Sequence, residues 1–240
     1  MTRLLYQTDS ALQTFTATLV AVDPATRTLT LDQTAFYPGG GGQPHDLGTL
    51  TAPDGTIYPL AKVSKAGAEV LHTVGGDAPL PPVGTPLTGA IEWTRRYALM
   101  RTHTAMHILC GVIWRDYAAQ VTGGNMEPLK GRMDFEFETL HGDFVRQVEA
   151  AINREVEAAR PVSVRILPRA EAFQIPDLIR TKINLLPEGI TEVRVVEIAG
   201  LDLQADGGTH VANTREVGTI RVTDYQSKGK INKRIYIALE

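Results

Sequence analysis

A stretch rich in proline and glycine is the feature of this sequence that most constrains its fold. Residues 75–86 read GGDAPLPPVGTP, and no apolar period typical of a helix or a strand continues through them. The chain has 240 residues, which is enough for two small domains. We therefore expect one domain at residues 1–92 and a second at residues 93–240, with the boundary just after this stretch.

The first ninety residues have the composition of β-strands, with many threonines and valines. Turn residues such as Pro53-Asp54-Gly55 separate the apolar segments. Short strands are expected at residues 14–22, 28–31, 48–51 and 57–63. Several short strands at close spacing predict a small N-terminal β-barrel.

The remainder of the chain alternates between helix and strand patterns. A helix is expected at residues 94–117, and another at 142–160, where Leu140, Phe144, Val148 and Ile152 recur every four residues. Strands are expected at residues 131–138, 162–167, 192–198, 218–224 and 235–239. Because this order is not a clean βαβ repeat, we expect an α+β domain with a mainly antiparallel sheet.

Composition excludes several classes of protein. The net charge of −3 argues against nucleic-acid binding through bulk positive charge, although a local basic patch remains compatible with it. A single cysteine, Cys110, excludes a disulfide scaffold and fits a reducing compartment. No apolar run reaches the roughly 18 residues of a membrane span, and the N-terminal residues lack a signal core. We therefore expect a cytoplasmic protein with no membrane partner.

The strongest local signal is the pair His103 and His107, in the order HTAMH. Histidines four residues apart lie on one face of a helix, one turn apart, and this spacing lets two imidazoles share one metal ion. Zinc proteases with this spacing need a glutamate after the first histidine, but Thr104 stands there. A protease is therefore disfavoured. Taken alone, such a pair of histidines more often packs or forms hydrogen bonds than binds a metal.

A second cluster, Asp206-Gly-Gly-Thr-His210, places a carboxylate and an imidazole four residues apart. The two glycines permit a tight bend that would aim both side chains at one point. Together the clusters offer three histidines and one carboxylate, which are ordinary zinc ligands in the number that suits a tetrahedral ion. The clusters lie about a hundred residues apart, so spacing alone leaves a polar turn as the alternative reading.

Several motifs together resemble one family. They are LDQTAFYPGGGGQ at residues 31–43, HTAMH at 103–107, QVTGGNMEP at 120–128, RMDF at 132–135, GLDLQADGGTHVANTREVG at 200–218, SKGK at 227–230 and Arg234-Ile235. The chain is similar to the editing module of alanyl-tRNA synthetase and, more closely, to the free-standing alanyl-tRNA editing proteins of the AlaX type. It resembles the medium-length form, because it has room for the N-terminal barrel but none for a long C-terminal extension.

The resemblance implies a hydrolase that removes the amino acid from mischarged tRNA(Ala). The substrate would chiefly be Ser-tRNA(Ala), with Gly-tRNA(Ala) as a second candidate, and catalysis would depend on one Zn²⁺ per chain. The implied metal ligands are His103, His107, Asp206 and His210. Two alternatives stay open: a non-catalytic tRNA-binding protein whose editing site has drifted, and a metallohydrolase acting on another small ester or amide.

One position departs from the family pattern. The family usually has cysteine directly before Gly-Gly-Thr-His, whereas this chain has Asp206. Zinc accepts carboxylate oxygen, but the site loses a thiolate, its softer ligand. Cys110 follows His107 by three residues, so its thiol would share the helical face of the histidines. The alternative for Cys110 is a small buried core residue.

Four polar residues near the motifs are candidates for catalysis or for reading the serine hydroxyl. Gln120 and Thr122 follow the expected metal-binding helix, and Thr104 and Thr209 neighbour the expected ligands. For Gln120 and Thr122, ordinary strand polarity is the competing explanation. No Ser or Cys nucleophile with an adjacent His and acid is evident, so a covalent intermediate is not expected.

Two further segments are candidates for tRNA contacts. The glycine run Gly39, Gly40, Gly41 and Gly42 lacks the Gly-Lys-Ser/Thr ending of a phosphate loop, so we expect no ATP. The resemblance instead assigns this run and Gln43 to the editing cleft, with a wide turn as the alternative.

The second segment is a basic turn with Lys228, Lys230, Lys233 and Arg234, which Arg95, Arg96 and Arg101 would extend. It is the best candidate for phosphate contacts on a chain of net charge −3, although basic turns are often merely solvated.

Overall fold

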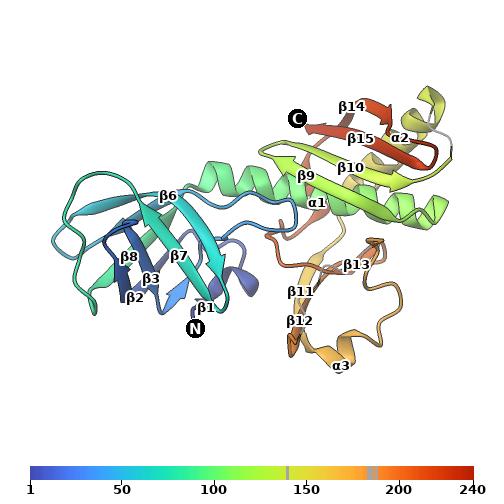
Figure 1. The fold of residues 1–240 in the computed structure, drawn as a ribbon. Coiled ribbons are helices and arrows are strands. Elements are labelled where there is room, and N and C mark those ends of the chain that lie inside the picture. The colour runs from blue at the N-terminus through green and yellow to red at the C-terminus, as the bar shows by residue number, and fades with distance from the viewer. Residues whose placement is uncertain (139–140, 183–185, 187–188) are drawn as a thin grey trace. The chain divides into compact units, whose positions relative to one another are not determined.

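The computed structural model describes residues 1–138, 141–182, 186 and 189–240. Figure 1 shows its helices and strands, which form two units, Met1–Tyr97 and Ala98–Glu240. The predicted α+β class is confirmed, and so is the mainly antiparallel pairing of the sheets. The domain boundary expected after residue 92 remains a proposal, and the division between the two units falls after Tyr97, inside a helix.

The first unit contains the predicted barrel. Six strands close it in the order β2 (Thr14–Asp23), β3 (Thr28–Leu31), β7 (Glu69–Val74), β6 (Ile57–Ala66), β5 (Gly48–Thr51) and β8 (Pro86–Ile91), and all neighbours are antiparallel. Residues in β2 alternate, with Phe15, Ala17 and Leu19 buried inside the barrel and the intervening threonines exposed. A short parallel pair, β1 (Arg3–Leu4) and β4 (Gln33–Thr34), lies outside this ring, with the 3₁₀ turn η1 at Leu5–Gln7.

The Pro/Gly-rich stretch has a different role from the one its composition suggests. Its irregular residues connect β7 to β8, and Pro86 is the first residue of β8. Strand β8 pairs with both β2 and β5 and thereby closes the barrel. The stretch is therefore a connection within the barrel rather than a linker.

A fully buried arginine joins the barrel residues to the start of helix α1 (Trp93–Tyr117). The Arg96 guanidinium donates to the Asp46 carboxylate, with Nε–Oδ1 at 2.9 Å, and to the carbonyl oxygens of Ser10 and Ala35 at 3.0 and 2.6 Å. Asp46 also accepts the Tyr37 amide at 2.6 Å. Because each of the three guanidinium nitrogens has an acceptor, and one acceptor is the Asp46 carboxylate, the buried charge is compensated.

The second unit contains a four-stranded antiparallel sheet in the order β14 (Ile220–Ser227), β15 (Asn232–Leu239), β10 (Lys130–Glu136) and β9 (Val121–Glu127). Helix α1 lies against it: the Leu129 amide donates to Thr102 Oγ1 at 2.9 Å.

Strand β10 ends at Glu136, two residues before the end expected from the sequence. Asp134 breaks the expected alternation of buried and exposed residues, because it is buried in a bidentate ion pair with Arg234.

Helix α2 (Gly142–Glu157) packs against β14, and His141 caps it by accepting the Phe144 amide. It ends before the expected residue 160, and Leu140, part of the periodicity that predicted it, lies outside the described residues. The short turn η2 (Thr214–Val217) has a capping box formed by Asn213 and Glu216.

A separate three-stranded sheet, β11 (Val162–Pro168), β12 (Glu192–Ile198) and β13 (Asp202–Ala205), packs its apolar side chains with those near α3 (Arg169–Ala172). Sequence patterning did not predict β13. This strand is short and leads directly into Asp206.

Among the described residues, no helix has the length and apolar character needed to cross a membrane.

The barrel contains a histidine whose burial makes the stability of the first unit depend on pH. His72 is fully buried between Leu29 O (3.2 Å) and Thr34 Oγ1 (2.9 Å), and burial lowers its pKa to about 4. The unfolded chain, with a histidine pKa of about 6.5, then binds the proton more readily than the folded chain.

We predict that the free energy of unfolding is unaffected by protonation of this histidine above pH 6.5 and that it decreases as the pH falls towards 4, because the unfolded chain then takes up the proton first. The loss between pH 7 and pH 5 should be about 2 kcal/mol. Urea unfolding at both pH values measures it. His72→Gln, which keeps a donor and an acceptor but does not titrate, should show a smaller difference between the two pH values. Equal acid dependence in parent and variant would disprove the assignment.

Candidate metal centre

Helix α1 brings two histidines to one place. His103 and His107 lie one turn apart, with ring centroids 5.1 Å from each other, and both side chains are buried. Residues 102–113 of the helix are all buried, so both rings are removed from bulk water. This arrangement follows from the four-residue spacing.

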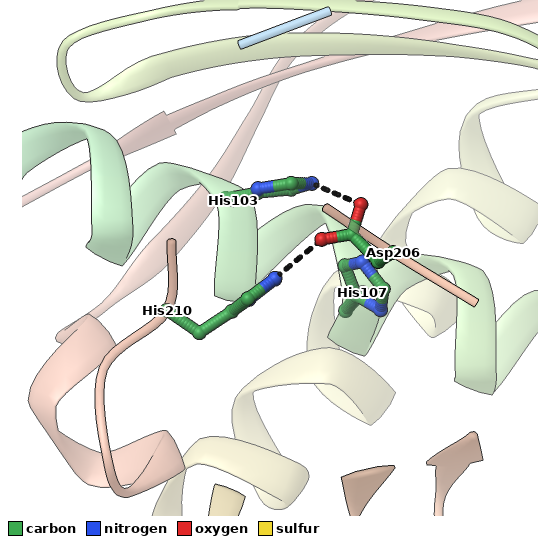
Figure 2. A group of neighbouring side chains, drawn as sticks. All are labelled: His103, His107, Asp206 and His210. Atoms are coloured by element: carbon green, nitrogen blue, oxygen red, sulfur yellow. Dashed lines mark hydrogen bonds and ion pairs between the residues drawn. The ribbon is translucent and has the colours of Figure 1, made fainter. Parts of the chain in front are cut away.

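The other two side chains come from the segment after β13. Asp206 follows the strand directly, and its Oδ1 accepts the Gly208 amide at 2.9 Å, which closes a tight turn. His210 then points back to Asp206, with Nε2–Oδ1 at 2.9 Å. Figure 2 shows the carboxylate between the rings of His103 and His210.

The four side chains therefore converge, as the two sequence clusters predicted. One ligand atom from each of His103, His107, Asp206 and His210 lies within 4.8 Å of the others. His103 Nε2 is 3.7 Å from Asp206 Oδ2, and the His210 ring centroid is 4.3 Å from that of His103 and 4.8 Å from that of His107. Among the described residues this is the one group of such side chains close enough to hold a metal ion.

Burial and mutual charge set the protonation of this cluster. Burial lowers the pKa of His103 well below its usual value and that of His210 to about 4, so both rings are neutral near pH 7. Burial alone would raise the pKa of the Asp206 carboxyl, but the adjacent histidines hold it well below its usual value. Neutral imidazoles and an ionised carboxylate are the forms that bind a metal, as in His103, His210 and Asp206. Burial would also lower the pKa of His107, but the effect of the Asp202 carboxylate outweighs that of burial, and this pKa is raised instead.

Hydrogen bonds behind the cluster fix the orientation of two rings. His210 Nδ1 is 3.3 Å from Thr104 Oγ1, which also accepts the Val211 amide at 3.3 Å. His107 Nδ1 donates to Asp202 Oδ2 at 2.7 Å. His107 thus has its Nδ1 engaged, and its Nε2 remains as the ligand atom for an ion. His210 Nε2 lies 2.9 Å from Asp206 Oδ1, so that contact would give way to a shared ion. Asp202 was not predicted from the sequence.

Cys110 does not belong to the cluster, although it shares the helix. Its side chain is buried, its Sγ accepts a hydrogen bond from Gln204 Nε2 at 3.3 Å, and burial raises the pKa of the thiol above its ordinary value. A buried thiol with a raised pKa is neither a ready metal ligand nor a nucleophile.

The donor set fits a zinc ion. Three imidazoles and one carboxylate are ordinary zinc ligands. Bonds of about 2 Å place tetrahedral ligand atoms about 3.3 Å apart, so a spread within 4.8 Å needs only small side-chain movements. The four residues can therefore hold a metal ion, and their chemistry is compatible with zinc.

The candidate catalytic residues are placed differently from one another. Thr104 and Thr209 are fully buried beside cluster residues. Gln120 and Thr122 are exposed, and Thr122 Oγ1 donates to Asn232 Oδ1 at 3.0 Å. In the part of the chain that the structure describes, neither has a hydrogen bond to the metal cluster, so their role stays a prediction.

The glycine run forms a tight hairpin turn in the first unit. Gly40 and Gln43 exchange two backbone hydrogen bonds of 3.0 and 2.9 Å, and Gly41 and Gly42 between them have φ of 57° and 88°. Two successive positive φ values define the turn type that requires glycine. Gln43 is buried. The segment is therefore a turn, but a tight one rather than the wide turn expected as the alternative. Its assignment to tRNA binding stays a prediction.

The basic turn forms the tip of the hairpin between β14 and β15, and its four cations have different environments. Lys228 and Lys230 are exposed. Lys233 is buried, and its Nζ donates to Ser227 Oγ, Gly229 O and Lys230 O at 3.1, 2.7 and 2.9 Å. Arg234 forms the ion pair with Asp134 described above. Lys233 therefore holds the hairpin tip together, and Arg234 ties β15 to β10.

Arg101 is similarly engaged within the chain. Its guanidinium donates to Val217 O at 2.8 Å and to Glu240 O at 2.8 Å, which ties α1 to η2 and to the last described residue. Because these carbonyl groups take its donors, Arg101 has fewer donors to offer a phosphate than a solvated arginine.

Comparison with known sequences links the chain to the alanyl-tRNA synthetases. The family described as the threonyl and alanyl tRNA synthetase second additional domain matches residues 193–236, which include β12, β13, Asp206 and His210. The chain is also 37% identical to an alanine–tRNA ligase of Pyrobaculum aerophilum over 92% of its own length, but it spans only 25% of the ligase.

Full-length relatives define the family more closely. The chain is 37% identical to the alanyl-tRNA editing protein AlaX-M of Methanosarcina acetivorans, over 100% of the chain and 99% of the relative. It is 35% identical to the AlaX-M protein of Saccharolobus solfataricus over 100% of both. The chain belongs to the AlaX-M family of alanyl-tRNA editing proteins.

The carboxylate at position 206 provides a test of the metal centre. We predict that Asp206→Ala releases zinc to a chelator more readily than the parent, by roughly 10–100-fold or more, because three imidazoles remain. Asp206→Cys should retain zinc longer, since a thiolate is the softer donor. Zinc release in a chelator competition measures both.

The control is Asp77→Ala, which removes an exposed carboxylate of the first unit and should leave zinc retention unchanged. If Asp206→Ala holds zinc as firmly as the parent, Asp206 is not a ligand. The ion would then rest on the three histidines.

Proposed function

We propose that this protein is a zinc-dependent hydrolase that deacylates mischarged tRNA(Ala), chiefly Ser-tRNA(Ala) and, to a lesser extent, Gly-tRNA(Ala). The observation that carries the proposal is the buried cluster of three histidines and Asp206 in a chain similar over its whole length to AlaX-M editing proteins. The substrate bond is the ester that joins the amino acid to the terminal ribose.

The chemistry of serine explains why a separate editing site is useful. A synthetic site for alanine rejects the slightly larger serine poorly. A second pocket can instead require the serine hydroxyl, and a site built to hydrogen-bond a hydroxyl rejects the analogue without it by roughly 10⁴-fold or more. Correctly charged Ala-tRNA(Ala) is then spared. Glycine lacks the hydroxyl, so its removal would be slower.

Each side chain of the cluster has a proposed role. His103, His107, Asp206 and His210 hold the ion. Bound zinc supplies a Lewis acid that polarises the ester carbonyl and lowers the pKa of water. Asp206 has the most exposed side chain of the four, at 15%. It is therefore the ligand best able to yield its place when a substrate enters.

Buried hydroxyl groups next to the ligands are the proposed readers of the serine side chain. Thr104 holds His210 through its Oγ1, and Thr209 precedes His210 and is fully buried. Both are small, so they can bind a serine-sized group without filling the site. Gln120, directly before β9, and Thr122 within that strand are both exposed and remain candidates, which would contact the tRNA end rather than the ion.

Only two of the four cations in the basic turn are exposed and available for phosphate contacts. Lys228 and Lys230 are exposed at its tip, whereas Lys233 and Arg234 are engaged within the chain. We therefore assign phosphate contact to the first two, and assign Lys233 to holding the turn in shape. Gly39, Gly40, Gly41, Gly42 and Gln43 stay proposed as a second tRNA-binding segment.

The function is tested by comparing three substrates with the zinc-loaded protein. We predict fastest hydrolysis of Ser-tRNA(Ala), slower hydrolysis of Gly-tRNA(Ala) and no detectable hydrolysis of Ala-tRNA(Ala), measured as release of labelled amino acid. His103→Ala should lose both zinc and activity. Asp134→Asn breaks an ion pair without touching the cluster, so it should keep both.

Two results would favour other functions. Binding of tRNA by a zinc-loaded protein that leaves all three esters intact would indicate a non-catalytic tRNA-binding protein. Equal hydrolysis of simple serine esters with no gain from the tRNA would indicate a different metallohydrolase.

The basic turn gives a separate prediction about tRNA binding. Lys228→Ala combined with Lys230→Ala should weaken binding and reduce the slope of log affinity against log salt concentration by roughly one unit per lost phosphate contact. Zinc content should not change. The matched control is Lys62→Ala with Lys65→Ala, two exposed lysines of β6. An equal effect of both double variants would argue against a specific role for the turn.

A further inference from the structure

A buried carboxylate lies behind the metal centre, on the side of His107 that faces away from the other ligands. Asp202, the first residue of β13, has a fully buried side chain, and its Oδ2 accepts the His107 Nδ1–H at 2.7 Å. It is not among the four side chains that converge. Its only partner in that cluster, within the described residues, is His107.

Two more donors hold this carboxylate in place. Arg180 Nη1 donates to Asp202 Oδ1 at 2.5 Å, and Gln204 Nε2 donates to Oδ2 at 2.8 Å. The Arg180 guanidinium also lies over the Trp114 ring of α1, with 5.5 Å to the centroid. A buried carboxylate that accepts three hydrogen bonds, one of them from a guanidinium, is held in one orientation.

The close approach of β13 to α1 depends on a glycine. Gly111 lies one turn after His107 on α1, and a Cβ atom there would be 2.8 Å from Leu201 Cγ and 3.0 Å from Leu201 O. Any other residue would therefore push the start of β13 away from the helix. Without a side chain at this position, the strand begins near enough for Asp202 to reach His107.

We propose that Asp202 is a positioning residue: it fixes His107 with its proton on Nδ1 and thereby directs Nε2 at the metal. Arg180 and Gln204 act through Asp202, because their side chains contact the carboxylate and not the ligand ring. Metal-bound histidines commonly donate their other ring N–H to a carboxylate, which orients the ring and makes it a stronger donor. This inference rests on the metal site of the proposed function but not on the identity of the substrate.

The test measures zinc affinity and the ring protons of His107 in the full-length protein. Asp202→Asn removes the charge at nearly constant shape, and we expect zinc affinity to fall roughly 10–100-fold. In the zinc-loaded parent, the Nδ1–H of His107 should exchange slowly with solvent and give a sharp proton resonance. In Asp202→Asn this proton should exchange faster, because the charged acceptor is gone.

A second variant guards against simple misfolding. Asp202→Asn combined with Arg180→Gln removes both charges, so no unpaired guanidinium is left buried. If Arg180 acts through Asp202, this double variant loses no more zinc affinity than Asp202→Asn alone. The matched control is Asp134→Asn, which breaks a buried Asp–Arg pair of the same unit but has no contact with the histidines.

Each outcome decides the inference. Lower affinity and faster proton exchange in both Asp202 variants, with an unchanged control, support it. Parental zinc affinity in Asp202→Asn or in the double variant overturns it, as does an equal loss of affinity in Asp134→Asn, which would mean that stability alone was measured. If the parent binds no zinc, the inference and the metal site both fail. If zinc binds and Asp202 matters but no ester is hydrolysed, only the proposed function fails.

Discussion

The second unit depends on a helix that is buried along most of its length yet carries polar side chains. A buried polar group without a hydrogen-bond partner costs about 1–3 kcal/mol. Thr102 Oγ1 therefore accepts the Leu129 amide, Thr104 Oγ1 accepts the Val211 amide, and His107 donates to Asp202. These partners come from three different segments of the chain. The polar groups of α1 thus fix where the surrounding segments lie, and the metal centre is a consequence of that packing.

Local spacing predicted each half of the side-chain cluster, but neither that the two halves would meet nor which residues lie behind them. The HTAMH spacing and the Asp206-Gly-Gly-Thr-His210 turn each determine their own geometry, so both could be recognised in the sequence. Asp202 was missed because it meets His107 across 95 positions, and this contact depends on the approach allowed by Gly111. Strand β13 was missed for a related reason: its four residues have no periodicity of their own and are held by pairing with β12.

Strands with a regular pattern of apolar residues were predicted well. Strands whose position depends on the neighbouring strands that they pair with were not. Strands β2 and β12 have regular apolar patterns and lie where expected. Strand β8 begins at a proline within a segment that resembles a loop, and its position follows from pairing with β2 and β5. The burial of Lys233 could not be foreseen either, because lysine is rarely buried unless its ammonium group finds acceptors, and those acceptors are backbone groups of the turn itself.

The basic residues of this chain serve mainly to hold it together, and this limits how it can bind RNA. Arg96, Arg101 and Arg234 each donate to carboxylates or carbonyls of the chain, and Arg180 supports Asp202. The net charge of −3 also gives the chain no overall attraction for phosphates. Non-specific attraction to tRNA is then weak, since it scales with the number of phosphates neutralised. For the proposed deacylase, discrimination would therefore come from short-range contacts. In that regime one buried hydroxyl reader and a rigidly oriented metal centre would have the largest effect on which ester is cleaved.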